Sequence, residues 1–267
     1  MKQIKTLLAA LFVAMAGTAG AQTKNYVHIT KTDGTKVHFS QDEIESMTID
    51  TNTPEEYFVT FTDGTNTVKV AKMNLGATSV ADGTSCYGDY YAWGATEPFG
   101  TVNQSTGTVT ATDGHAGGYT EANAPADFAD VVTAKMGTGY HMPTRAELQT
   151  LYAACGGSFS GSTTTYDTKG IYWVAGATST VTIGGDKYKV NGLLFVQDAD
   201  THVFFPAAGG VNGTNLNFAG FRGYYWSSSL VESFTDRAYY LHFYSDGVRP
   251  DNTYHRYSGF TVRPFKD

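Results

Sequence analysis

Alternating apolar and polar residues mark two short hairpins near the start of the chain. Residues 26–30 and 36–39 alternate on either side of Asp33-Gly34, and residues 57–61 and 68–70 alternate around a second Asp-Gly pair. Asp-Gly favours the tight turns that join antiparallel strands. The pattern therefore predicts two β-hairpins.

The first hairpin belongs to a small predicted module. Ser40 and Glu43 have the spacing of a helix capping box, and residues 47–49 have the composition of a strand. Residues 22–52 are therefore expected to form a ββαβ module, followed by a linker near Pro54. Because so short a segment cannot bury a core alone, we expect it to pack on the main domain or on an envelope partner.

One strong helical pattern lies at residues 144–154. Thr144 and Glu147 form a second capping box, and Leu148 and Leu151 recur on one face. A Gly-Gly pair follows and predicts the helix end.

The rest of residues 56–267 predicts short strands separated by long loops. Stretches 101–124 and 156–168 are rich in Gly, Thr and Ser and are expected to be loops. Few helices and many strands indicate an α+β class. Strands are expected at residues 171–174, 188–190, 193–196, 202–205, 223–226, 238–245 and 259–264.

The first 21 residues have the pattern of a secretory signal peptide. Lys2 and Lys5 precede an apolar run that ends near Met15, and small residues close the segment at Ala21. We expect cleavage after Ala21 and export to the periplasm, outer surface or medium. No other stretch is apolar enough to predict membrane insertion after cleavage.

Charge and cysteine content narrow the function classes. The 267-residue chain has a net charge of −7, which becomes −9 without Lys2 and Lys5. An acidic chain lacks the cationic footprint that nucleic-acid binding needs. The two cysteines, Cys86 and Cys155, allow a disulfide in an oxidising compartment or two buried free thiols.

Catalytic and metal-binding motifs are not evident. The seven histidines form no zinc motif, and there is no nucleophile elbow or P-loop. His28 and His38 are expected on opposite strands of the first hairpin, and His141 is interpreted as structural. The Asp-Gly pairs lack the acidic array of a calcium loop. We therefore expect no cofactor, no metal and no enzymatic activity.

Five motifs follow one another along the chain, namely Asn74-Leu75-Gly76-Ala77, Tyr87-Gly88-Asp89-Tyr90-Tyr91-Ala92-Trp93-Gly94, His141-Met142-Pro143-Thr144-Arg145-Ala146-Glu147, Tyr225-Trp226-Ser227-Ser228-Ser229 and Gly259-Phe260-Thr261-Val262-Arg263-Pro264. In this order they resemble the Fibrobacter succinogenes major paralogous domain family. The resemblance covers roughly residues 56–267 and implies a loop-rich, C-type-lectin-like domain with its N- and C-terminal strands paired. That fold is shared with diversity-generating retroelement variable proteins and with formylglycine-generating enzymes. The enzymes need two reactive cysteines close together near the C-terminal part of the fold, and Cys86 and Cys155 do not match that arrangement.

The C-terminal segment is rich in tyrosine and small polar residues. Read as a strand, residues 238–245 place one alternating set toward the core (Tyr239, Leu241, Phe243 and Ser245) and the other toward solvent. Residues 246–258 are expected to form a long polar loop whose amino-acid composition resembles that of antibody loops. The predicted ligand-binding residues are Tyr240, His242, Tyr244, Asp246, Arg249, Asp251, Asn252, Thr253, Tyr254, His255, Tyr257 and Ser258.

The same composition is typical of retroelement-diversified segments, since these residue types arise from an Asn codon when its adenines are replaced. Gly247 would join the variable set. The segment is then either a retroelement target, a non-diversified relative, or a Tyr-rich loop that packs on its own domain. The fixed frame would be Trp226, Leu241, Phe243, Val248, Arg256, Gly259 and Phe260.

Two functions follow from these patterns. The leading hypothesis is a non-catalytic binding or adhesion protein whose C-terminal surface meets a protein or glycan on another cell or matrix. The alternative is a structural or assembly component of the envelope that docks through residues 22–52, with the lectin-like domain as a spacer.

Overall fold

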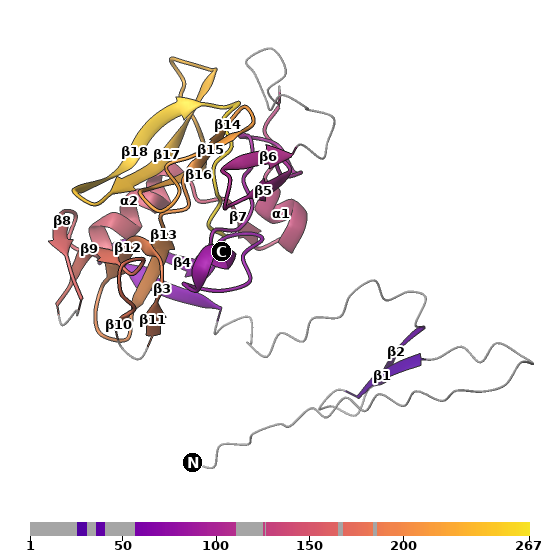
Figure 1. Ribbon diagram of the computed structural model, residues 1–267, viewed down its shortest axis with the longest axis horizontal. Coiled ribbons are helices and arrows are strands. Elements are labelled where there is room, and N and C mark those ends of the chain that lie inside the picture. The colour runs from indigo at the N-terminus through magenta and orange to yellow at the C-terminus, as the bar shows by residue number, and fades with distance from the viewer. Residues whose placement is uncertain are drawn as a thin grey trace, which may run out of the picture. The chain divides into compact units, whose positions relative to one another are not determined.

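The chain divides into two compact units, residues 1–51 and 52–267. The computed structural model describes strands at 26–30 and 36–40 in the first unit, and residues 57–110, 125, 127–164, 168–183 and 186–267 in the second (Figure 1). The predicted signal peptide, the Ser40 capping box and the strand at 47–49 lie outside the described residues.

The first unit contains the predicted hairpin. Strands β1 (Tyr26–Thr30) and β2 (Lys36–Ser40) pair antiparallel. His28 lies opposite His38, as the alternation predicts.

The second predicted hairpin opens the larger unit. Strands β3 (Phe58–Thr62) and β4 (Thr67–Ala71) pair around a turn in which the Asp63 carboxylate accepts two backbone amides. Strand β19 (Phe265–Lys266) pairs with β4 on one side and with β7 (Tyr140–His141) on the other. The first and last strands of this unit therefore share one sheet.

The strong helical pattern gives helix α2 (Arg145–Ala154), and its capping box is confirmed. The Thr144 hydroxyl accepts the Glu147 amide, while the Glu147 carboxylate accepts the Thr144 amide. A second helix, α1 (Val131–Met136), was not predicted because six residues are too few for a periodic signal. Its Asp130 cap accepts two helical amides. A short 3-10 turn, η2, spans Gly83–Cys86.

Two four-stranded sheets and a hairpin occupy regions that were partly predicted as loops. The described parts of residues 101–124 and 156–168 contain three strands, which corrects that prediction. Each strand is only three or four residues long, and one of them pairs with a strand far along the chain, a partnership that local composition does not reveal. The sheets have the orders β13-β12-β9-β8 and β14-β15-β6-β5. Their strands are β5 (Thr101–Asn103), β6 (Thr108–Thr110), β8 (Phe159–Ser162), β9 (Gly170–Ala175), β12 (Asn191–Val196), β13 (His202–Pro206), β14 (Gly210–Asn212) and β15 (Asn215–Asn217), beside the hairpin β10 (Val181–Ile183) and β11 (Asp186–Tyr188).

The last sheet has three strands, β16 (Arg222–Leu230), β17 (Arg237–Tyr244) and β18 (Gly247–His255), in that order. Helix α2 contacts all three strands and covers one face of this sheet (Figure 1). The predicted strand at 259–264 is replaced by single bridges from Phe260 to Tyr91 and from Thr261 to Tyr225, followed by β19.

The core consists of three apolar clusters, and the two cysteines lie in different ones. Cys86 packs in the cluster that contains Tyr188, whereas Cys155 packs with Leu151 and Phe243. Both thiols are free and buried, so the disulfide interpretation is wrong for this structure. Burial raises the pKa of each thiol to about 12.

The described part of the larger unit consists mostly of β-sheet and has two short α-helices. This is an α+β arrangement. None of the described helices is long and apolar enough to cross a bilayer.

Candidate ligand-binding site

The predicted C-terminal loop is a strand. Residues 247–255 form β18 and pair with β17 across a tight turn, which corrects the loop prediction. Tyr240 lies opposite Asn252 and His242 opposite Arg249, so β18 carries one extra residue at this point. The bulge accommodates Pro250, which has no amide to donate, on the edge of the sheet.

Strand β17 alternates as predicted, but the exposure of its two faces differs from the prediction. Leu241 and Phe243 are buried toward α2, whereas Tyr239 on the same face is half-buried beneath the guanidinium of Arg145. On the opposite face Tyr240 is only 3% exposed, so the prediction that it faces solvent is wrong. Both faces are covered because a second aromatic layer packs on the side away from α2.

That layer is a stack of aromatic rings. The Tyr224 ring stacks on His242 and on Phe260, each at 5.0 Å between centroids, and Phe260 packs on Trp226 at 4.4 Å. Gly210 permits this packing, since a Cβ there would lie 2.9 Å from the Phe260 ring. The rings form the floor of a cavity.

The cavity has a volume of about 250 Å³ and lies between the β14–β15 region and the three-stranded sheet. It brings together residues that lie up to 50 positions apart in sequence, from Gly210 to Phe260. Four predicted ligand-binding residues line it, namely Tyr240, His242, Tyr254 and Ser258. The remaining lining residues are Gly210, Val211, Asn212, Asn217, Phe218, Arg222, Tyr224 and Phe260.

The four predicted residues in the cavity differ in exposure. Tyr254 is 39% exposed and stands at the mouth, and His242 is half-buried. Ser258 is fully buried, so it lines the wall without being displayed on the surface. Ser258 is buried because the next two residues, Gly259 and Phe260, form β-bridges to Val211 and Tyr91.

Other predicted site residues surround the cavity. Tyr244 packs against His242 at 5.6 Å between ring centroids, and Arg249 is exposed on the neighbouring strand. The Asn252 amide donates to the Tyr240 hydroxyl at 3.1 Å, which holds that ring in place. Asn252 and Thr253 are half-buried.

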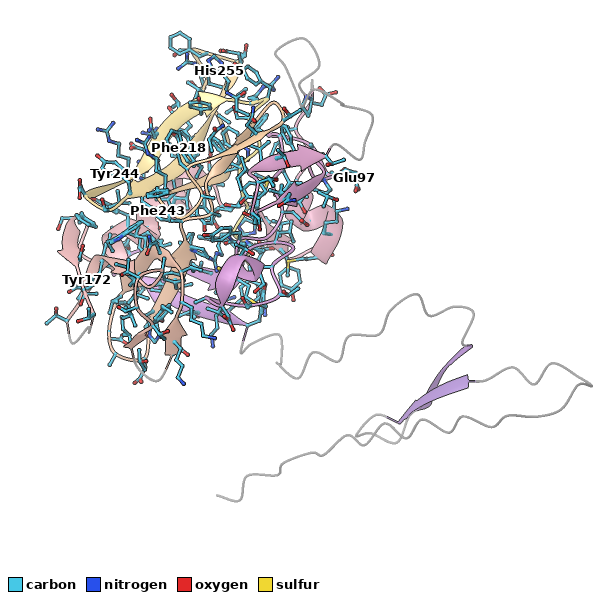
Figure 2. The ribbon with its side chains drawn as sticks, in the orientation of Figure 1. Glu97, Tyr172, Phe218, Phe243, Tyr244 and His255 are labelled. Carbon is cyan, nitrogen blue, oxygen red and sulfur yellow. The ribbon has the colours of Figure 1, made fainter. Side chains whose placement is uncertain are left out.

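The remaining predicted residues lie elsewhere. Asp251 pairs with Arg145 on the α2 side of the sheet at 3.1 Å, and Asp246 stays at the β17–β18 turn. His255 bonds the Asp236 carboxylate at 2.9 Å and stacks on Tyr257. Figure 2 shows Tyr244 and His255 at opposite ends of the β17–β18 ribbon, so the predicted set covers more than one surface.

Several cavity residues were not predicted. Phe218 and Arg222 lie at the mouth and Tyr224 in the floor. The sequence signal was present, since Phe218 and Phe221 are isolated aromatics in a stretch rich in Asn and Gly, and Arg222 has the period-two spacing to Tyr224. Only the pairing of Tyr224 with His242 shows that this face joins the predicted one.

The electrostatics of the cavity favour a neutral histidine beside two cations. Burial, followed by the nearby charges of Arg222 and Arg249, lowers the pKa of His242 to about 4. Burial also raises the pKa of the Tyr224 hydroxyl. The imidazole and phenol are therefore uncharged near neutral pH, and the two guanidinium groups carry the local charge.

No group of three His, Cys, Asp or Glu side chains suited to a metal ion occurs in the part of the chain that the structure describes. The cavity residues are donors and ring faces that suit an organic ligand.

Among known protein families, one matches the region that contains this cavity. A family model described as Domain of unknown function (DUF8237) matches residues 194–265, from β12 to the start of β19. The match includes the whole three-stranded sheet and every residue of the cavity. No curated protein matches the chain, and no solved structure matches it.

Proposed function

We propose that this chain is an exported, non-catalytic binding protein that takes its ligand in the cavity between β14–β15 and the β16–β17–β18 sheet. The signal-peptide pattern supports export, and the motif order supports a relationship to the Fibrobacter succinogenes family and its lectin-like fold. The cavity is the main support for a ligand-binding function.

The decisive observation is an aromatic cavity whose mouth exposes ring faces. Phe218 is 52% exposed and Tyr254 is 39% exposed at its mouth, while the floor rings of Tyr224, Tyr240 and Phe260 are buried. Exposed aromatic rings beside a preformed floor supply contact area at low entropic cost. Asn212 and Asn217 add amide donors and acceptors at the same mouth.

A matched pair of variants tests this proposal. The full chain is screened against arrays of glycans and matrix glycoproteins, together with the double variant Phe218→Ala/Tyr254→Ala. We expect bound ligands to lose about tenfold or more in affinity, since exposed aromatic anchors carry much of a binding energy. The control is Phe234→Ala, which removes an even more exposed ring (61%) that does not line the cavity.

The control is expected to retain every ligand. If the double variant binds the same ligands with unchanged affinity, the cavity is not the binding site.

A further inference from the structure

Two arginines without acidic partners act on His242: Arg222 lines the cavity, and Arg249 lies opposite His242 on the neighbouring strand. Arg222 and Arg249 are both exposed, and no carboxylate lies within ion-pairing distance of either among the described residues. Arg145, by contrast, pairs with Asp251 on the far side of the sheet. In a chain of net charge −7, two neighbouring unpaired cations favour an anionic ligand.

Between these arginines lies an unsatisfied polar atom. His242 pairs with Tyr224 on one neighbouring strand and with Arg249 on the other, and its ring lines the cavity. Its Nε2 atom is buried and has no hydrogen-bond partner in the described part of the chain. An unpaired buried nitrogen is unfavourable, and a hydrogen bond to a ligand oxygen removes that cost.

The mouth also contains a strained aromatic residue. Phe218 has φ = 60°, a left-handed conformation that is rare for a bulky residue. Its carbonyl accepts the amides of Phe221 and Arg222, each at 3.0 Å, so a tight turn maintains the strain. The Arg222 guanidinium lies 4.4 Å from the centre of the Phe218 ring. This turn therefore places a ring face and a cation together at the mouth.

The volume limits the size of the ligand. At about 250 Å³ the cavity lies below the roughly 300–1,000 Å³ typical of drug-sized ligands. Exposed ring faces and the amides of Asn212 and Asn217 suit a small ring that carries hydroxyl groups. A single sugar ring meets these requirements.

Building on the proposed function, we propose that the cavity binds an anionic sugar residue, with its anion facing Arg222 and Arg249 and one of its oxygens bonded to His242. The sugar ring packs against Phe218 and Tyr254. The anion is a carboxylate or a sulfate ester, since either presents oxygens to guanidinium groups.

Soluble monosaccharides test this assignment on the full-length protein. The carboxylate probes are glucuronic acid and N-acetylneuraminic acid, the sulfate probe is N-acetylglucosamine 6-sulfate, and the neutral probes are glucose and N-acetylglucosamine. Affinities are measured by calorimetry or ligand-observed NMR. We expect at least one acidic probe to bind about tenfold or more tightly than its neutral counterpart.

Two charge-matched variants distinguish the cavity from general electrostatics. Arg222→Gln is expected to weaken binding of the acidic probe by about tenfold. Arg145→Gln removes the same charge on the opposite face and is expected to change affinity by less than about twofold. Thermal unfolding of both variants checks that each is folded.

Three results would overturn the assignment. Equal affinity for acidic and neutral sugars removes the role of the anion, yet leaves the proposed binding function in place. Arg222-dependent binding of an oligoglutamate peptide, without binding of any sugar, replaces the sugar with a protein ligand. Failure of every sugar probe also rejects the assignment, whereas the array screen with Phe218→Ala/Tyr254→Ala decides the proposed function separately.

Discussion

His242 illustrates how the surroundings of one side chain determine its chemistry. Its ring contacts Tyr224, Tyr240 and Tyr244, and the cations nearest to it are Arg222 and Arg249. Because no carboxylate among the described residues acts on this imidazole, burial and like charge both favour the neutral ring. Its folded-state pKa of about 4 lies below the ordinary value of 6.5.

This depressed pKa predicts a loss of stability in mild acid. Between pH 6.5 and about 4 the unfolded state binds more protons at this residue, so the free energy of unfolding falls as the pH falls. We expect the thermal midpoint of the wild type to drop more steeply over this range than that of His242→Gln. Parallel curves for the two proteins would contradict the prediction.

His141 provides an internal contrast for that measurement. Its hydrogen bond to Glu147, 2.8 Å from Nε2 to Oε1, raises its pKa. The stability that His141 contributes is therefore present in acid and lost as the pH rises through its folded-state pKa. His141→Gln should consequently lose the gain in stability that the wild type shows as the pH falls from the folded-state pKa of His141 to 6.5, whereas its effect should stay constant below pH 6.5, where His242→Gln acts.

At the scale of elements, helix α2 packs against two sheets of the larger unit. It covers one face of the β16–β17–β18 sheet and also contacts β3 and β4. Leu148 and Leu151 are buried, as the periodicity predicts. The capping box defines where the helix begins, and Glu147 serves both the cap and His141.

Removing the cap should therefore destabilise the whole unit. Thr144→Ala deletes the acceptor for the Glu147 amide, and a lost N-cap costs about 1 kcal/mol of unfolding free energy. Denaturant unfolding measures the change. The control Thr101→Ala, at an exposed strand position, should change stability by less than about 0.5 kcal/mol; an equal loss in both variants would refute the capping argument.

At the scale of the whole molecule, a buried arginine, and not a disulfide, links two of the sheets. Arg263 is fully buried, donates to the carbonyl oxygens of Ala71 and Phe204, and lies 4.3 Å from the Phe205 ring. It thereby connects β4 to β13. The cysteines occupy separate apolar clusters, and the Cys86 thiol donates to the Gly83 carbonyl oxygen.

Thiol labelling tests this arrangement. In the native protein both buried thiols, with pKa values near 12, should resist iodoacetamide. In guanidinium without reductant both Cys86 and Cys155 should be alkylated, as mass spectrometry can measure. Alkylation of the unfolded chain only after reduction would show instead that a disulfide forms.

Local signals in the sequence were sufficient for elements defined by neighbouring residues. The Asp-Gly hairpins, the helix from residue 145 and most short strands follow from turn chemistry, capping and periodicity. Helix α1 and strands β5, β6, β8, β10, β14 and β15 were not found, because each is too short for a periodic signal. Strand β6 also pairs with β15, a partner far along the chain that no local pattern reveals.

The site was predicted only in part for the same reason. Period-two spacing correctly separated Tyr240 from Leu241 within β17, but spacing cannot show that Tyr224 and Phe260 cover the Tyr240 face. Diversification of this segment stays a prediction. The burial of Tyr240 and Ser258 leaves Tyr254, Arg249, Asp251 and Asp246 as its most exposed members.

The residue pattern thus determined an aromatic, acidic, strand-rich chain with a tyrosine-rich C-terminal segment, because those properties depend on composition and near neighbours. Tertiary structure alone decided that the segment is an edge hairpin and that Phe218 and Arg222 join it around one cavity. It also decided that the cysteines stay apart. These outcomes depend on strand pairing between residues distant in sequence, and pairing partners are selected by packing across the whole core.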